Sequence, residues 1–247
     1  PLISKLINYN YDFKTDKDYF KKNESGEIIE QQSSLIAAIK LQDSNARTQI
    51  ITFLINEAKV DINDDSQLSS NNDGFTALMY ASYYNDIDTL YLLLKNKAIV
   101  NMAEKVKHRT ALMIAIEFNN ISSLKYLLSY YKTQNLSIQE RNFRGETPLI
   151  IASKYSNVEA FRALLSHDPS SAPLKDNQYR DALFWASNSQ DILLELLNQN
   201  HQELDWNHFC YRSTKSGKVS IVNTLLMFNK TKSIIDINKQ DDLHGKT

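Results

Sequence analysis

Two short segments carry the Gly-Lys pair that nucleotide-binding loops use to hold phosphates. They are Ser216-Gly217-Lys218-Val219 and Gly245-Lys246-Thr247. A P-loop also needs a glycine five residues before the Gly-Lys pair and a Ser or Thr directly after the lysine. Arg212 occupies that glycine position in the first segment, where valine follows the lysine, and Gln240 occupies it in the second. The sequence therefore argues against a nucleotide site.

The remaining reactive side chains form no catalytic or metal-binding pattern. The five histidines are dispersed, and none belongs to an H-E-x-x-H or C-x-x-C sequence. The single cysteine, Cys210, is predicted to be a small core residue, because free cysteines are among the most buried residue types. Asp64-Asp65 and Asp241-Asp242 are interpreted as solvated loop acids. We therefore predict no catalytic residues, no metal and no cofactor, and a protein that is not an enzyme.

Composition narrows the class of protein further. The chain has 247 residues, 42% of them hydrophobic, with a formal net charge of -1 and no long basic or acidic block. This charge pattern argues against binding to nucleic acid or to an anionic membrane. A lone cysteine suggests a reducing, intracellular setting, and we expect a cytoplasmic protein. Abundant Asn, Lys and Ile suit an AT-rich genome, which leaves open a secreted effector acting in a host cytosol.

A six-residue pattern recurs along the chain. It stands at Thr76-Ala77-Leu78-Met79-Tyr80-Ala81, at Thr110-Ala111-Leu112-Met113-Ile114-Ala115 and at Thr147-Pro148-Leu149-Ile150-Ile151-Ala152. Asp181-Ala182-Leu183-Phe184-Trp185-Ala186 repeats it without the threonine. The first residues are 34, 37 and 34 positions apart. A fixed period of this length is typical of repeat proteins.

A second apolar pattern follows each start at 11, 14, 17 and 18 residues. In the first unit these positions are Ile87, Leu90, Leu93 and Leu94, and the next two units repeat the spacing. Such spacing places apolar side chains on one face of a helix. Asn and Ser residues that favour turns lie between the two patterns, as at Asn85-Asp86. Each unit is therefore predicted to be a helix, a tight turn, an antiparallel helix and a loop.

The same template finds three weaker units. From Ser33, Leu35 and Ala38 match the first helix, and Leu54-Ile55 match the second after about four inserted residues. The unit from Asp181 is two residues shorter at its turn. The unit from His208 places Val219, Val222, Leu225 and Leu226 on the second helix, with Ser216-Gly217-Lys218 as its turn.

These features resemble the ankyrin repeat family. The T-[AP]-L-x-x-A pattern, its period and the G-x-T at Gly74-Phe75-Thr76 and Gly145-Glu146-Thr147 carry the resemblance. It implies an all-α, ankyrin-type helix-turn-helix solenoid with hairpin loops. The family's usual histidine after the leucine is replaced by Met79, Met113, Ile150 and Phe184. We therefore expect apolar contact there in place of hydrogen bonds between neighbouring repeats.

The repeat register divides the chain into one continuous domain, residues 1–247. A partial repeat is expected at 1–13 and an insertion at 14–32. Repeats start near 33, 76, 110, 147, 181 and 208, and a further repeat begins at 245–247. Because both ends cut through repeats, the parent protein is expected to hold more repeat sequence on both sides.

The resemblance also implies where a partner protein would bind. Ankyrin proteins use residues just before the repeat start and at the end of the first helix, on their concave face. The residues predicted to bind a partner are Phe75, Tyr83, Tyr84, Arg109, Glu117, Phe118, Phe143, Glu146, Lys154, Tyr155 and Arg180. Aromatic residues and arginine are the residue types that anchor interfaces. Packing of Tyr84, Phe118 and Tyr155 against neighbouring repeats is the alternative explanation.

We therefore predict a protein-protein interaction module, monomeric, that binds a partner protein on its concave face. The alternative is a structural solenoid, a spacer linked to a catalytic or effector domain outside this sequence. A contiguous exposed aromatic surface would favour the first function, and a fully solvated polar face would favour the second.

The repeat register makes a prediction about stability. Leu93→Ala and Leu127→Ala should each lower the free energy of unfolding by roughly 2–5 kcal/mol, because each would leave a cavity in the core. Thermal melts of the two variants beside the wild-type protein measure this, and unchanged melting temperatures would contradict the register.

Overall fold

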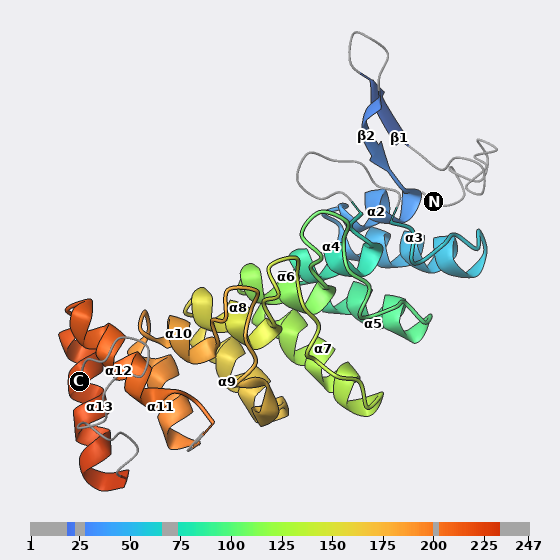
Figure 1. Cartoon of the computed structure of the whole chain (residues 1–247). Coiled ribbons are helices and arrows are strands. Elements are labelled where there is room, and N and C mark those ends of the chain that lie inside the picture. The colour runs from blue at the N-terminus through green and yellow to red at the C-terminus, as the bar shows by residue number, and fades with distance from the viewer. Residues whose placement is uncertain (1–18, 23–27, 66–73, 200–202, 233–247) are drawn as a thin grey trace. The chain divides into compact units, whose positions relative to one another are not determined.

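The computed structural model describes residues 19–22, 28–65, 74–199 and 203–232, with side chains between 33 and 230 (Figure 1). The described residues form an all-α succession of paired helices, as predicted, preceded by one two-stranded hairpin. The elements are β1 Tyr19–Lys22, β2 Ile28–Gln32, α2 Ser34–Ile39, α3 Ser44–Asn56, α4 Ala77–Tyr83, α5 Ile87–Lys95, α6 Ala111–Glu117, α7 Ile121–Thr133, α8 Pro148–Lys154, α9 Val158–His167, η1 Pro169–Ser171, α10 Ala182–Ala186, α11 Gln190–Asn198, α12 Trp206–Lys215 and α13 Val219–Lys232. Below, the first helix of each pair is called the inner helix and the second the outer helix.

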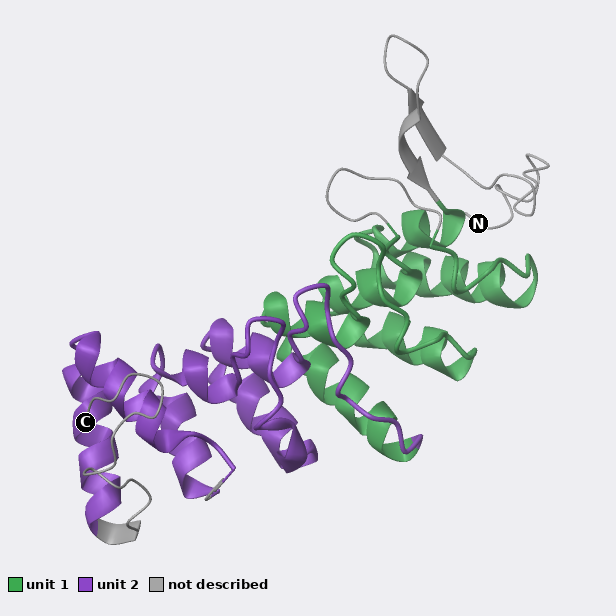
Figure 2. Ribbon diagram, in the orientation of Figure 1, with its two compact units in different colours: residues 1–133 green, residues 134–247 purple. Residues whose placement is uncertain are grey.

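The helices belong to two compact units, coloured separately in Figure 2. Unit 1 comprises residues 1–133 and contains the elements from β1 to α7. Unit 2 comprises residues 134–247 and contains those from α8 to α13. The single domain of residues 1–247 stays a prediction.

The first residue of the recurring pattern is the N-cap of an inner helix. Thr76, Thr110 and Thr147 each accept a hydrogen bond from the backbone N–H three residues later. Ser33 and Asp181 do the same before α2 and α10. A side-chain oxygen at this position satisfies an N–H that has no partner within the helix. This explains why the pattern begins with Thr, Ser or Asp, and we number each repeat from this residue as position 0.

The turn between inner and outer helices requires a left-handed residue. Asn85, Asn119 and Ser156, at position +9, have φ of 55°, 55° and 53°. Gly217, with φ of 66°, lies in the corresponding turn between α12 and α13. Asparagine and glycine tolerate this conformation better than other residues. The predicted inter-helix turns, including the one at Ser216-Gly217-Lys218, are therefore confirmed.

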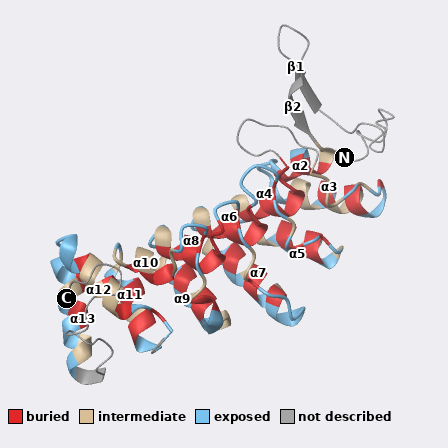
Figure 3. Ribbon diagram, viewed as in Figure 1, coloured by how far each residue is buried: buried red, intermediate tan, exposed pale blue. Residues whose placement is uncertain are grey.

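Buried residues, red in Figure 3, lie along the helices of each unit, and most of the predicted leucine pairs are among them. Leu93, Leu94, Leu127 and Leu128 are buried in unit 1, and Leu164-Leu165 are buried in unit 2. On the inner helices, the side chains that replace the family's histidine are also apolar and packed. They are Met79, Met113 and Ile150, which are buried, and Phe184, which is half-buried.

Hydrogen bonds between neighbouring repeats are nevertheless present, at another place than the family's histidine. In unit 1 the Asn120 side chain donates to the carbonyls of Ser82 and Tyr83 at the end of α4, at 2.8 and 2.7 Å. In unit 2 the Lys218 ammonium donates to the Ser187 carbonyl and the Asn188 side chain, both at 2.8 Å. Each side chain satisfies carbonyls that are left open at the end of the preceding inner helix. Apolar side chains therefore occupy the position of the family's histidine, and other residues make the polar contacts between repeats.

The register predicted for the last repeat is wrong. Its N-cap is Asp205, and α12 is ten residues long against seven for α4, α6 and α8. Val219 and Leu226, predicted to be core, are 67% and 42% exposed, whereas Leu225 is buried as predicted. Cys210 is only partly buried and is not a core residue. Three extra residues in α12 displace its N-cap from His208 to Asp205. The second helix begins at Val219 as predicted, so the exposure of Val219 and Leu226 is a separate difference.

The first helix of the repeat at Ser33 follows the prediction, with Leu35 and Ala38 buried on α2, but the predicted insertion of about four residues is wrong. The helix α3 begins at Ser44, 11 residues after Ser33, as α5 begins 11 residues after Thr76. Ile50 and Ile51 occupy the positions of the leucine pair and are buried, and Leu54 and Ile55 are buried one turn later on a longer helix. Within the expected insertion at 14–32, β1 and β2 pair as an antiparallel hairpin with a register shift between Lys21 and Lys22. The expected partial repeat at 1–13 and the repeat start at 245–247 lie outside the described residues.

The residue two before the N-cap is left-handed in the repeats of α4, α6, α8 and α10. Gly74, His108, Gly145 and Tyr179 all have φ between 55° and 77°. This explains the glycine of the G-x-T sequence. Gly145 has a second constraint, since a Cβ there would lie 2.8 Å from the backbone nitrogen of Asn177. That nitrogen donates to the Arg144 carbonyl at 2.9 Å, so the hairpin loops of two adjacent repeats in unit 2 contact each other through backbone.

Two glycine variants separate these effects. Gly217→Ala should cost about 1 kcal/mol of unfolding free energy, because alanine is disfavoured at positive φ and nothing lies near its Cβ. Gly145→Ala should cost roughly 2–4 kcal/mol, because it also displaces the Asn177 backbone and its hydrogen bond. Denaturant unfolding of both variants measures the difference, and equal costs would contradict the close contact.

Candidate protein-binding surface

A buried polar network holds the hairpin loop before α6. Glu104 accepts hydrogen bonds from the backbone N–H groups of Val106 and Lys107 at 2.7 and 2.9 Å. The same carboxylate pairs with Arg109 Nε at 2.9 Å, and Arg109 Nη1 pairs with Glu117 at 2.9 Å. The side chains of Arg109 and Glu104 are 5% and 1% exposed. Arg109 therefore links the hairpin loop to the last residue of α6.

Burial and hydrogen bonding act in opposite directions on the pKa of Glu104. Burial favours the neutral carboxyl, but the hydrogen bonds from Lys107, Arg109 and Val106 outweigh it and lower the pKa from 4.5. The Arg109 pKa is raised, because its two carboxylate partners outweigh its own burial. Both groups are therefore charged near neutral pH.

The hairpin loop before α8 has the same arrangement with the charges reversed. Asn142 accepts from the N–H groups of Arg144 and Glu146 at 2.9 and 3.0 Å. Its amide donates to Glu146 at 2.7 Å, and Glu146 pairs with Lys154 at 2.6 Å. Glu146 is at position -1 and Lys154 at +7, the positions that Arg109 and Glu117 occupy in the preceding repeat. The ion pair between positions -1 and +7 therefore forms with the cation at either of the two positions.

A third hairpin loop, before α10, uses an aspartate. Asp176 accepts from the N–H groups of Gln178 and Arg180, and its other oxygen pairs with Arg180 Nε at 2.8 Å. These hydrogen bonds outweigh the effect of burial and lower the Asp176 pKa from 3.8. Glu104 precedes its arginine by five residues and Asp176 by four. The longer side chain, that of Glu104, thus lies in the loop with one more residue before the arginine.

These networks correct the predicted exposure of three candidate binding residues. Phe75, Arg109 and Glu146 were expected to face solvent, but all three are buried. Phe75 packs edge-to-face on Tyr80 at 5.4 Å, with the Arg109 guanidinium 5.2 Å from its ring centre. Each side chain is enclosed by contacts within its own unit. We conclude that they support the surface from beneath, where a partner cannot reach them directly.

Other candidate residues of unit 1 do lie at the surface. Tyr84 and Phe118 are 48% and 47% exposed, and Tyr83, between them, is half-buried. The ring centres of Tyr83 and Phe118 are 4.5 Å apart, and those of Tyr83 and Tyr84 are 5.0 Å apart. We call Tyr83, Tyr84 and Phe118 the unit 1 aromatic cluster. Glu117, half-buried, lies directly before Phe118.

Backbone geometry explains how this cluster forms. Tyr83 is the last residue of α4, and Tyr84 and Phe118 are the C-caps of α4 and α6. Adjacent inner helices in unit 1 thus present side chains from the same end. Burial, with a smaller effect from Tyr83, raises the pKa of Tyr84, so its hydroxyl is neutral near physiological pH.

The candidate residues of unit 2 are spread over its hairpin loops and α8. Tyr155 and Phe143 are 54% and 50% exposed, and the Arg144 guanidinium lies 5.1 Å from the Phe143 ring centre. Lys154 and Arg180 are half-buried in their ion pairs, and both lie over the ring of Trp185. The prediction that Tyr155 continues the aromatic cluster of unit 1 stays a prediction, because it concerns two separate units.

Sequence reasoning missed Phe184, Trp185 and Arg212, which lie together in unit 2. The Arg212 guanidinium is 3.6 Å from the Phe184 ring centre, and the Phe184 and Trp185 rings are 5.1 Å apart. Phe184 was noted only as a replacement for the family's histidine. Arg212 is at position +7 when its repeat is counted from Asp205, but the misplaced start put Lys215 there. A search of the sequence for N-cap residues would have placed the repeat start at Asp205, before Trp206, and Arg212 at position +7.

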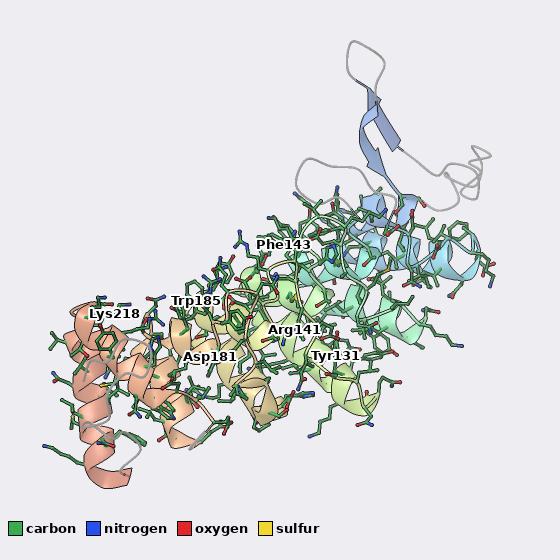
Figure 4. The ribbon with its side chains drawn as sticks, in the orientation of Figure 1. Tyr131, Arg141, Phe143, Asp181, Trp185 and Lys218 are labelled. Carbon is green, nitrogen blue, oxygen red and sulfur yellow. The ribbon has the colours of Figure 1, made fainter. Side chains whose placement is uncertain are left out.

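The described residues offer little other chemistry. No group of three or more His, Cys, Asp or Glu side chains in them is placed to hold a metal ion. None of the helices described is both long and apolar enough to cross a membrane. Lys218, which resembled a P-loop lysine, instead binds the end of α10 and is labelled beside Trp185 in Figure 4.

Comparison with known proteins identifies the family that this chain resembles. The model of ankyrin repeats in three copies matches residues 2–104, 35–140 and 133–210. Rabankyrin-5 of Mus musculus is 30% identical over 147 residues, which cover 57% of this chain and 12% of that protein. An ankyrin repeat protein of Rickettsia felis is 32% identical over 95 residues, covering 38% and 30%. Palmitoyltransferase ZDHHC17 of Danio rerio is 34% identical over 84 residues, covering 34% and 13%. The chain thus spans less than a third of each of these relatives.

The Glu104 network predicts a pH effect. Glu104→Gln should lower the unfolding free energy at neutral pH by roughly 1–3 kcal/mol, because Arg109 loses a charged partner in a buried place. The lowered pKa means that the wild-type contribution is full above pH 4.5 and is lost as pH falls toward the folded pKa. Stability of the variant should therefore fall less between neutral pH and about pH 3.

Urea unfolding at several pH values measures this effect. Glu117→Gln is the matched control, because it removes the other, less buried carboxylate that Arg109 contacts. An acid-induced loss of stability that is identical in Glu104→Gln and the wild type would contradict the assigned role.

Proposed function

Because the chain belongs to the ankyrin repeat family, we propose that it is a non-catalytic module that binds a partner protein through the ends of its inner helices. Ankyrin repeats are generally protein-protein interaction modules. The observation that supports this proposal best is the unit 1 aromatic cluster, in which two large rings are about half exposed and in contact with a third.

The cluster has the properties of an interface anchor. Tyr83, Tyr84 and Phe118 offer apolar rings, and the tyrosine hydroxyls add polar atoms. Arg109, fixed by Glu104, holds Glu117 at the end of α6, and Asn120 binds the carbonyls at the end of α4, so both helix ends are held before a partner arrives. Binding to such a preorganised surface loses less conformational entropy. An extended peptide or a helix with an apolar face is the partner chemistry that these rings would accept.

The surface residues of unit 2 extend the proposal. Tyr155 and Phe143 are exposed aromatics at the end of α8 and on its hairpin loop. Lys154 and Arg180 are half-buried and carry charge at the edge of the proposed contacts. A structural spacer without a partner is the competing function, and it gives no reason for aromatic rings to be exposed at the inner helix ends.

Paired alanine variants test the proposal. Tyr84→Ala and Phe118→Ala should each weaken binding of the partner by ~2 kcal/mol or more, about 30-fold in affinity, if they anchor the interface. Their melting temperatures should change little, because roughly half of each ring is already in solvent. Tyr91→Ala is the matched control, because Tyr91 is 49% exposed on the outer helix α5.

The measurement uses the wild-type protein and the three variants in parallel. Proteins captured by the wild type are purified, and their affinities for all four proteins are determined by titration. If Tyr84→Ala and Phe118→Ala unfold while the affinity per folded molecule holds, the rings belong to the core. Equal losses in Tyr91→Ala would place the contact elsewhere.

A further inference from the structure

Arg212 on α12 differs from the cations that flank the two preceding inner helices of unit 2. In the two preceding repeats the cations there are neutralised, because Lys154 pairs with Glu146 and Arg180 pairs with Asp176. In the repeat of Arg212, position -1 is the buried Leu204, which offers no carboxylate. Within the described residues Arg212 makes no salt bridge, and its guanidinium lies over the ring of Phe184 at 3.6 Å.

The surroundings of Arg212 are aromatic and cationic. We call Lys154, Arg180, Phe184, Trp185 and Arg212 the Arg212 cluster. Arg180 lies 5.6 Å from the Phe184 ring centre and 4.8 Å from that of Trp185, and Lys154 lies 5.5 Å from Trp185. Both rings are half-buried, so part of each faces solvent. Figure 4 labels Trp185 on α10.

Nearby lysines add charge that no carboxylate neutralises. Lys218 binds two neutral acceptors, the Ser187 carbonyl and the Asn188 side chain. Lys215 is exposed on α12, with its ammonium 5.9 Å from the ring centre of Tyr211. Neither lysine takes part in a salt bridge within the part of the chain that is described. The ends of α10 and α12 therefore form a positive surface with aromatic rings beside it.

The carboxylate of Asp181 does not neutralise Arg212. Asp181 attracts it, but burial has the larger effect and lowers the Arg212 pKa. The Asp181 carboxylate instead accepts from the Phe184 N–H at 2.9 Å as the N-cap of α10, and burial raises its pKa. Arg212 stays charged, since the guanidinium pKa is far above neutral. A half-buried cation with open hydrogen-bond donors favours an anionic acceptor.

We propose that the Arg212 cluster binds a carboxylate side chain from an acidic segment of the partner protein. The planar guanidinium, held flat on Phe184, can donate two parallel hydrogen bonds to one carboxylate. Apolar parts of the segment contact Phe184 and Trp185, and Lys215 and Lys218 attract further acidic residues. A phosphate group fits less well, because phosphate recognition uses clusters of arginines and Arg180 is already bound by Asp176 through two nitrogens.

This inference rests on the proposed function and specifies the chemistry of the partner at a second surface, in unit 2. The probe is a fluorescein-labelled decapeptide with six glutamates, and the same peptide with glutamines is its control. Fluorescence anisotropy at low salt should detect the glutamate peptide and not the glutamine peptide, and affinity should fall as salt rises.

Two variants of equal charge test the site. Arg212→Gln should weaken binding of the glutamate peptide by at least about tenfold, because a charge-assisted hydrogen-bond pair is lost. Arg162→Gln removes the same charge from the outer helix α9, where Arg162 pairs with Glu195, and should leave the affinity unchanged. Equal weakening by both variants would show attraction by net charge alone and would overturn the proposal.

Further outcomes are equally decisive. Should Arg212→Gln fail to fold, Arg212→Lys keeps the charge without the planar fork, and we expect about three- to tenfold weaker binding. Affinity equal to wild type in Arg212→Lys would overturn the assignment, as would a phosphoserine peptide that binds while the glutamate peptide does not. Failure of the peptide with intact binding at the unit 1 aromatic cluster would refute this inference and leave the proposed function standing.

Discussion

Each inner helix is too short to be stable in isolation, and the rest of the structure depends on this constraint. The helices α4, α6 and α8 have seven residues each, and α10 has five. Isolated helices below about 12–15 residues are marginal in water. Every inner helix that the structure describes is therefore capped by a side chain at its start, and each except α12 is buried along most of its length against its outer helix and a neighbouring repeat. Side chains from the next repeat, Asn120 in unit 1 and Lys218 in unit 2, bind carbonyls at its end.

The hairpin loops follow from the same constraint. An N-cap can act only if the chain enters the helix from a defined direction, and the loop before it sets that direction. In three loops one acid or amide, Glu104, Asn142 or Asp176, accepts the backbone N–H groups of the turn. Each also holds the side chain at position -1. Buried ion pairs contribute little net stability, but they define the geometry of the loop. Removing one partner would leave the other charge buried alone.

This arrangement separates the residues that hold the surface from those available to a partner. In two repeats the side chains at positions -1 and +7 pair with each other, Arg109 with Glu117 and Glu146 with Lys154, so the side chain at -1 is enclosed and the residue at +7 is partly covered. Position +8, the C-cap, then carries the ring that projects into solvent, as at Tyr84, Phe118 and Tyr155. Where position -1 is apolar, as at Leu204, the residue at +7 is left without its partner. The chemistry of the proposed surfaces thus changes from mainly aromatic in unit 1 to cationic and aromatic in unit 2.

The sequence by itself determined the repeat and the core. Threonine at an N-cap, apolar residues at helical spacing and turn-forming asparagines are local requirements, and they recur often enough to be read along the chain. They located the helix pairs and most of the buried leucine pairs, but they placed inserted residues in the repeat at Ser33, because Leu54-Ile55 were matched where Ile50-Ile51 belong. They misplaced the last repeat, because α12 is three residues longer and a template of fixed length cannot detect this. Only the tertiary structure decided which candidate residues reach solvent. Arg109 and Glu146 are enclosed by partners four to eight residues away, and Phe75 by Tyr80 and by Arg109 of the next repeat; these contacts depend on loop geometry. Arg212 was left without a carboxylate because Leu204, eight residues before it, is turned into the core.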